Sequence, residues 1–85
     1  MVTSKASVAG YLGSELKIHR KSLGISGKEL ACRLNVSQQQ ISRYERGANS
    51  LNFDMLFLYF QALEMTGYEI ESVFNGLIFN YYQSQ

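Results

Sequence analysis

The sequence contains no proline, one cysteine and one histidine among its 85 residues. A single cysteine cannot close a disulfide within the chain, and one cysteine with one histidine cannot complete a zinc site. The chain lacks any run of about 18 uncharged apolar residues, so we expect no contact with a membrane interior. Residues 1–10 hold one lysine and no apolar stretch, which argues against a secretory signal. We therefore expect a cytoplasmic protein.

Cysteine and histidine often act in catalysis or metal binding, but the single cysteine and the single histidine of this chain are both interpreted as structural. Cys32 follows Ala31 in a short helical segment that needs small buried residues, so we interpret it as a packed thiol rather than a reactive one. His19 lies on or beside the apolar stripe of the first expected helix, where a packed or phosphate-facing side chain is expected. No catalytic set of acid, base and nucleophile is present, and no phosphate-binding loop. The sequence therefore predicts neither an enzyme, nor a cofactor, nor a small-molecule ligand.

Basic residues are absent after Arg46. The first fifty residues hold all eight basic residues and three acidic ones, a net charge of +5, whereas residues 51–85 hold four acidic residues and no basic one, a net charge of −4. Nine of the eleven aromatic residues lie in this second part. The division suggests one half that faces a polyanion and another with much apolar surface to bury. A dipolar, solvated surface would show the same charges, so charge alone does not decide between these interpretations.

Apolar residues recur with helical spacing near the N-terminus. One stripe consists of Leu12, Leu16, His19 and Leu23. Gly24 is expected to end this helix, because glycine readily adopts the left-handed conformation of a helix end. Ser26 and Glu29 are then spaced as a capping box, in which each side chain bonds the other residue's amide. A second, short helix is therefore expected to begin after Ser26.

Two short helices joined by a tight turn are expected between residues 27 and 46. The inward residues of the first are Leu30, Ala31 and Leu34. Asn35 suits the turn because asparagine tolerates the left-handed conformation. The second helix runs from Gln38 to Arg46 and carries only Ile41 and Tyr44 as apolar residues. Its other positions are polar: Ser37 as the cap, then Gln38, Gln39, Gln40, Ser42, Arg43 and Arg46. This arrangement is typical of a helix-turn-helix motif.

An outer face of glutamine and arginine suits base edges in the major groove of DNA. Glutamine pairs with adenine, and arginine with guanine, through two hydrogen bonds each. Three residues, Gln38, Gln39 and Arg43, are expected to read bases, because the first turns of a recognition helix meet them. The expected contacts to the DNA backbone are Ser37, Lys28, Arg46, Gln40 and Ser42. A solubilising surface is the alternative, but such surfaces use Lys–Glu pairs more often than three consecutive glutamines.

Residues Leu12–Phe74 resemble the Cro/C1-type (XRE) helix-turn-helix repressors, most specifically in Val36–Gly47, VSQQQISRYERG. The resemblance implies an all-α fold, a five-helix bundle of the lambda-repressor type with a short C-terminal extension. It also implies a buried ion pair between Arg20 and Glu45 that holds the first helix to the recognition helix. Within the family, the stretch 37–45 is most similar to MrpJ-type regulators encoded with fimbrial operons, which implies a role in fimbrial and motility control.

One position and one loop depart from the family pattern. Gly27 stands where many members have a glutamine that touches phosphate, and Lys28 is expected to serve that phosphate instead. The loop Ala48–Ser50 has no basic residue, although the family loop is often basic. Weak nonspecific DNA binding is expected, because each neutralised phosphate adds to counterion release.

The C-terminal third is expected to form two further helices. Asn52 is a candidate cap for a helix from Phe53 to Met65. Thr66 and Glu69 are spaced as another capping box and open a helix that ends at Asn75–Gly76. The residues expected to be buried in this helix are Ile70, Val73 and Phe74. The run 77–82 is too short for its periodicity to distinguish a strand from a helical turn. The chain is thus divided into a flexible N-terminus 1–8, a DNA-binding domain 9–76 and a tail 77–85.

The tail is expected to be a dimerisation element. One recognition helix reads too few base pairs to select a genomic site, and repressors of this type bind as two-fold dimers. Phe53, Phe57 and Phe60 are expected on faces of their helix that do not meet the core, and a monomer would expose them. The expected interface residues are Phe53, Phe57, Leu77, Phe79 and Tyr81. In the alternative, the tail folds back over Phe57 within one chain.

These patterns predict a sequence-specific regulator of transcription, a repressor that binds a double-stranded DNA operator as a homodimer with the 37–46 helix in the major groove. Two alternatives share the fold. In a HigA-type antitoxin, the aromatic C-terminal half would bind a toxin protein, and a neighbouring toxin gene would favour this alternative. In a pure protein-interaction domain, DNA binding would be lost, and the presence of Gln38, Gln39 and Arg43 argues against that.

Overall fold

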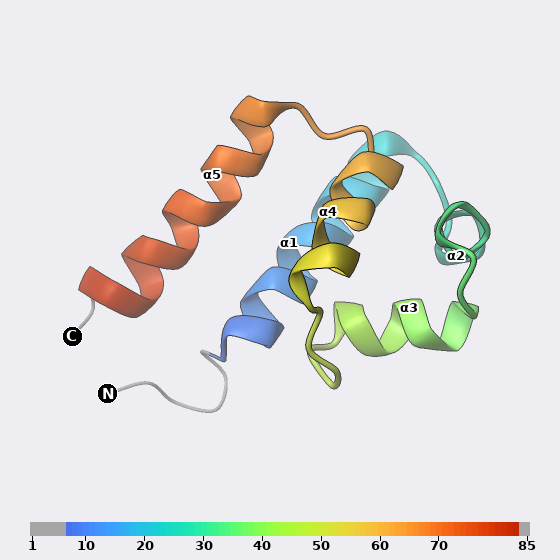
Figure 1. Cartoon of the computed structure of the whole chain (residues 1–85), viewed down its shortest axis with the longest axis horizontal. Coiled ribbons are helices and arrows are strands. Elements are labelled where there is room, and N and C mark those ends of the chain that lie inside the picture. Colours follow the sequence, from blue (N-terminus) through green and yellow to red (C-terminus); the bar gives the residue numbers. More distant parts are fainter. Residues whose placement is uncertain (1–6, 84–85) are drawn as a thin grey trace.

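A computed structural model describes residues 7–83, which fold as helices joined by turns (Figure 1). The elements are α1 Val8–Leu23, α2 Gly27–Leu34, α3 Gln38–Glu45, α4 Phe53–Ala62, α5 Gly67–Ile78 and a π-helical segment, η2, Phe79–Gln83. The expected all-α fold with five α-helices is confirmed. No helix in the described range combines the length and the apolar character needed to cross a bilayer. Most of the expected flexible stretch 1–8 lies outside the described residues, and α1 begins at Val8.

Side-chain caps explain where the helices begin. In each case a side-chain oxygen accepts a hydrogen bond from the amide three residues on, and the caps are Ser7, Ser26, Ser37, Asn52 and Thr66. The full capping box expected at Thr66 is present, with Glu69 Oε1 accepting from the Thr66 amide at 2.9 Å. At Ser26 only half of the expected box forms, because the Glu29 carboxylate pairs with Arg33 at 3.3 Å instead.

Left-handed backbone positions end several of the helices. Gly24 at φ 83° follows α1 and Asn35 at φ 57° follows α2, as the sequence predicts. α4 ends at Ala62, three residues before the expected Met65, because the chain enters the left-handed region at Glu64, φ 57°. Glutamate seldom adopts this conformation, so a glutamate at this position does not predict the end of a helix.

The hydrophobic core collects side chains from all five α-helices. Its buried members are Leu12, Leu16, Leu30, Ala31, Ile41, Leu56, Tyr59, Phe60, Leu63 and Val73. Phe60 was expected on an outer face and is 1% exposed, with its ring edge-on to Phe74 at a centroid distance of 6.1 Å. The reason is that α4 buries two adjacent stripes, one through Leu56 and Phe60 and one through Tyr59 and Leu63.

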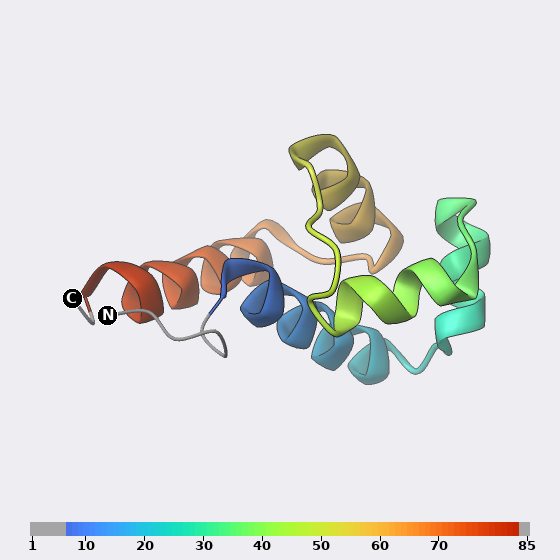
Figure 2. The same cartoon turned by 90° about the horizontal axis from the view of Figure 1, so that it is seen from below.

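α1 is the central helix of the bundle. α3 and α5 both pack against α1, and α2 packs against α3 and α4. In Figure 1, α3 lies along the lower edge and α5 lies on the left, on the opposite side of the molecule from α2. Figure 2 shows α4 rising out of the layer that contains α1 and α5. This arrangement leaves the outer faces of α3 and α4 uncovered by other described elements.

The C-terminal segment differs from the expectation. α5 does not end at Asn75–Gly76 but continues to Ile78 and into η2, so the described part of the tail is helical. Glycine inside a helix costs about 0.5–1 kcal/mol relative to alanine. Packing explains its presence, because the hydroxyl of Tyr11 lies against Gly76 where any Cβ would collide with it.

Cys32 is exposed, so the expectation of a packed thiol is wrong. The eight-residue α2 already turns Leu30 and Ala31 into the core. With about 3.6 residues per helical turn, the position after these two points toward solvent.

Candidate nucleic-acid interface

α2 and α3 form the helix-turn-helix unit that the sequence predicts. The turn between them is compact, since Asn35 at φ 57° lets the Val36 amide donate to the Ala31 carbonyl at 3.0 Å. Leu30 and Ala31 from α2 and Ile41 from α3 are buried on the inner side of the unit. The inner residues of both helices therefore join the core and leave the outer side of α3 free.

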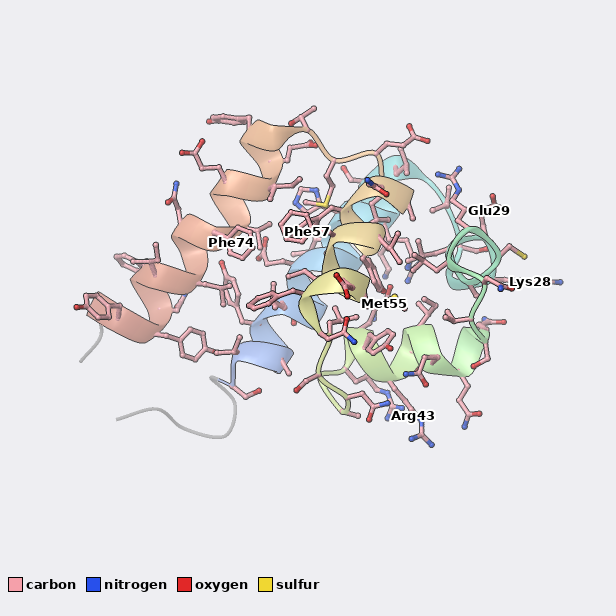
Figure 3. All side chains as sticks on the ribbon, in the orientation of Figure 1. Lys28, Glu29, Arg43, Met55, Phe57 and Phe74 are labelled. Atoms are coloured by element: carbon pink, nitrogen blue, oxygen red, sulfur yellow. The ribbon has the colours of Figure 1, made fainter. Side chains whose placement is uncertain are left out.

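The outer side of α3 presents polar side chains to solvent. Gln38, Gln39 and Arg43 are all exposed, and Arg43 extends away from the bundle at the lower edge of the molecule (Figure 3). Gln39 and Arg43 lie four residues apart, so they share one helix face. The three residues expected to read bases are thus accessible on one short helix.

The residues expected to contact the DNA backbone differ in their placement around this face. Ser37 is exposed, and its hydroxyl caps α3 by accepting from the Gln40 amide at 3.0 Å. Arg46 Nε donates to the Ser42 carbonyl at 3.3 Å, which holds its guanidinium near the end of α3. Lys28 extends sideways from α2 in Figure 3, in a different direction from the outer face of α3. Ser42 is exposed, and Gln40 is partly buried.

Lys17 on α1 also belongs to this surface, although the sequence analysis did not select it. A cavity of about 200 Å³ opens between Lys17, Gly27 at the start of α2, and Gln38 and Ser42 on α3. Lys17 is exposed beside this cavity. A signal for it was available, since Lys17 precedes Arg20 by three residues and therefore lies on the face of α1 that meets α3.

Glycine lets α1 approach the C-terminal end of α3 closely. A Cβ on Gly13 would lie 2.8 Å from the Glu45 carbonyl oxygen, and a Cβ on Gly47 would lie 2.6 Å from Gly10 Cα. Gly47 also has φ 74°, a conformation that favours glycine. The backbone of α1 therefore supports the end of α3 directly.

The ion pair that the resemblance implies between Arg20 and Glu45 is present. Arg20 Nε and Nη2 donate to the Glu45 carboxylate at 2.6 and 3.1 Å, and Nη1 donates to the Ile25 carbonyl at 2.9 Å. The two side chains are 11% and 7% exposed. The hydrogen bond to Glu45 raises the pKa of Arg20 above its usual value, and an arginine guanidinium is charged even without such a shift. The pair joins α1, the turn after it and α3 into one unit.

Tyr59 of α4 packs behind the recognition helix. Its ring lies edge-on to Tyr44, with the centroids 6.2 Å apart. The Tyr59 hydroxyl is buried and has no hydrogen-bond partner within residues 7–83. Burial, with a smaller contribution from the Glu45 charge, raises the pKa of Tyr59 above its usual value. Tyr59 therefore supports α3 by packing rather than by a hydrogen bond.

The residues expected at a dimer interface fall into two groups. Phe53, Phe57 and Phe79 are 78%, 52% and 66% exposed. In contrast, Leu77 packs partly against the core, and Tyr81 is partly buried beside Tyr11. Because Phe57 remains half exposed, the described tail does not cover it as the alternative required. Leu58, Ile78 and Tyr82 are also exposed, although they were not among the expected interface residues.

Comparison with known proteins identifies the family. Residues 16–70 match the sequence profile of a helix-turn-helix family. The clp gene regulator ClgR from C. glutamicum has a similar structure, with a TM-score of 0.74 and 26% identity, and the match covers 82% of this chain and 90% of ClgR. A point mutant of the restriction-modification controller protein C.Esp1396I has a TM-score of 0.70 and 25% identity, and the match covers 85% and 92% of the two chains. Curated protein sequences give no match. The chain belongs to the helix-turn-helix family, of the Cro/C1 (XRE) type.

Proposed function

We propose that this regulator binds a specific double-stranded DNA operator as a homodimer and represses transcription. The observation that carries the proposal is the outer face of α3, on which Gln38, Gln39 and Arg43 are exposed together. The Arg20–Glu45 pair and the backbone of α1 hold this face in place. A rigidly held helix with these side chains is what recognition of base edges requires.

In the proposed complex, α3 lies in the major groove with its N-terminal turn toward the bases. The glutamine amides bond adenine N6 and N7, and the Arg43 guanidinium bonds guanine O6 and N7. Ser37, Lys17, Lys28 and Arg46 are the proposed phosphate contacts, and Gln40 and Ser42 border the backbone. Phosphate contacts fix the register of the protein on the duplex, and base contacts select the sequence.

The proposed dimer forms through the C-terminal arm, defined as residues 76–83. Its outward apolar residues are Ile78, Phe79 and Tyr82, all more than half exposed. Residues 76–83 carry no charged side chain, so no like-charged side chains of the two arms face each other across a two-fold axis. In Figure 1 the arm lies at the left end of the molecule and α3 extends along the lower edge toward the right, so such a dimer leaves both α3 helices free for DNA.

Repression is the simplest outcome for a DNA-bound dimer of this size, because it occupies promoter DNA that RNA polymerase needs. The similar structures carry names that describe gene regulation and control. The resemblance of residues 37–45 to MrpJ-type regulators extends the proposal to fimbrial and motility genes as targets.

Selection of duplexes from a random library by the purified protein tests this proposal. We expect enrichment of a palindrome whose half-sites are centred about one helical turn apart. Gln39→Ala should weaken binding to that palindrome, whereas Gln61→Ala, on the exposed part of α4, serves as the matched control. Failure of the wild-type protein to enrich any sequence would contradict sequence-specific binding.

A second candidate, the HigA-type antitoxin, draws support from the outer face of α4. Phe53, Phe57 and Leu58 line an open cavity of about 400 Å³ together with Asp54 and Gln61. A toxin would have to cover this face. Co-expression of the chain with its neighbouring genes distinguishes the candidates, since an antitoxin retains a second protein in stoichiometric amount and loses it in Phe57→Glu.

A further inference from the structure

α1 connects the two parts of the molecule that the proposed function uses. Tyr11, in the first half of α1, contacts the C-terminal arm at two points. Its hydroxyl lies against Gly76, where a Cβ would collide with it. Its ring meets the ring of Tyr81 edge-on, with the centroids 6.4 Å apart and the planes at 84°. Tyr11 therefore contacts the arm at two positions that are more than one helical turn apart.

The arm is also braced from within at this place. Asn80 Nδ2 donates to the Gly76 carbonyl at 2.7 Å, which ties η2 to the last turn of α5. The described part of the arm continues α5 without a break. The contact with Tyr11 therefore positions the whole arm and not one side chain of it.

The same helix α1 holds the recognition helix. Gly13, two residues after Tyr11, lies against the carbonyl end of α3. Arg20, two turns further on, forms the ion pair with Glu45. α1 is an uninterrupted helix of 16 residues. The arm and α3 are thus attached to one rigid support at separate positions along it.

We propose that Tyr11 is a positioning residue for operator recognition: it fixes the angle between the arm and α3 and thereby sets the half-site spacing that the dimer accepts. The inference rests on the proposed function, in which the arm contacts a second copy of this chain. One base pair of added spacing moves a half-site by about 3.4 Å along the DNA axis and rotates it by about a tenth of a turn. A rigid connection between the dimer contact and α3 accepts one spacing, whereas a hinged connection accepts several.

The test compares wild type with Tyr11→Ala, which removes both contacts to the arm. The duplexes carry two copies of the selected half-site with the spacer at its natural length and one or two base pairs shorter or longer. A further duplex carries a single half-site. Wild type should lose about tenfold or more in affinity when the spacing is wrong, a difference of about 1.4 kcal/mol. Tyr11→Ala should lose less than about threefold, while its affinity for the single half-site equals that of wild type.

Tyr68→Ala is the matched control, because Tyr68 is an exposed tyrosine of α5 outside the arm. It should keep the wild-type spacing preference. Gly76→Ala provides a second variant, in which the new Cβ displaces the Tyr11 ring, and it should also lose the preference. Circular dichroism and sedimentation determine whether each variant is folded and dimeric at the concentrations used.

Three results would overturn the inference. Tyr11→Ala and Gly76→Ala could retain the wild-type spacing preference with intact half-site binding. Alternatively, both could be folded monomers where wild type is dimeric, which would make the contact a requirement for assembly rather than for spacing. Finally, wild type could fail to bind even the duplex with two half-sites at the natural spacing, which would refute the proposed function as well and is recognised before any other spacing is compared.

Discussion

Arg20 Nε lies 2.6 Å from Glu45 Oε2, although the two residues are 25 positions apart in the sequence. Arg20 belongs to α1 and Glu45 is the last residue of α3, so the pair links the recognition helix to the support on which it rests. Neither side chain can rehydrate readily, because both are largely buried. The geometry of α3 therefore depends on a contact that involves none of the residues proposed to touch DNA bases.

Arg20→Ala should lower the free energy of unfolding by about 3–5 kcal/mol, because it leaves the Glu45 carboxylate buried without its partner. Urea denaturation followed by circular dichroism measures this change. The double variant Arg20→Met with Glu45→Leu should recover much of the loss, since it removes both charges and keeps the volume. Arg33→Ala is the control, because its ion pairs are solvent-exposed and should matter little. Equal midpoints for Arg20→Ala and Arg33→Ala would contradict a buried pair.

Gln38→Ala and Arg43→Ala should each weaken binding to the selected operator by about 1–3 kcal/mol and relax the preference at one base pair. Both side chains are exposed, so the helical content should remain that of wild type. Titration against operators substituted at single positions measures the effect. Operator affinity unchanged in both variants would refute the assignment of α3 as the reading element.

Lys17→Ala should weaken binding to all duplexes alike and reduce the slope of log K against log salt by about 1, because it removes one phosphate contact. Lys21→Ala is the control, since Lys21 is exposed in the last turn of α1 and does not border the cavity beside α3. Affinities measured at several salt concentrations give the slope. The same slope in wild type and Lys17→Ala would place Lys17 outside the interface.

Gly13→Ala should destabilise the fold by about 1–3 kcal/mol, the usual cost of overpacking, and displace α3. The collision involves backbone atoms of Tyr44 and Glu45, which cannot move aside as a flexible side chain would. Gly67→Ala is the matched control, because a Cβ there meets no atom within 4 Å. That variant should be stabilised by about 0.4–1 kcal/mol, through a less flexible unfolded chain. A thermal melt of Gly13→Ala at or above wild type would contradict the close approach of α1 and α3.

The parts of the fold that were predicted correctly are those with local chemical causes. Ser37 and Thr66 cap helices because their own hydroxyls reach amides three residues on, and Asn35 turns the chain because its own backbone tolerates positive φ. The outer face of α3 could likewise be predicted, since a helix packed on one side must keep its polar residues on the other. These features need no knowledge of distant segments.

The features that were missed depend on partners far away in the sequence. Gly76 looks like a helix end, but it is a helix interior position because Tyr11 occupies the space that a side chain would take. Phe60 looks like a surplus aromatic residue, but Phe74 of α5 completes its pocket. Lys17 enters the candidate interface because the long-range pair of Arg20 with Glu45 brings that face of α1 onto α3, and its three-residue spacing from Arg20 is informative only once that pair is known. Local patterns do not contain such long-range contacts.

Tyr59→Phe should raise the free energy of unfolding, by about 1 kcal/mol, because it removes a buried hydroxyl that has no partner within residues 7–83. The pH dependence gives an independent check. Burial raises the pKa of Tyr59 above 10.0 in the folded state, so the unfolded chain loses this proton first. The stability that comes from keeping Tyr59 protonated should therefore be fully present below pH 10 and be lost as the pH rises above it. Tyr59→Phe should lessen this fall in the free energy of unfolding. Tyr68→Phe, at an exposed position, should change neither quantity. A Tyr59→Phe protein less stable than wild type at neutral pH would show that the hydroxyl makes a favourable bond, with the nearby Glu45 carboxylate as the first partner to examine.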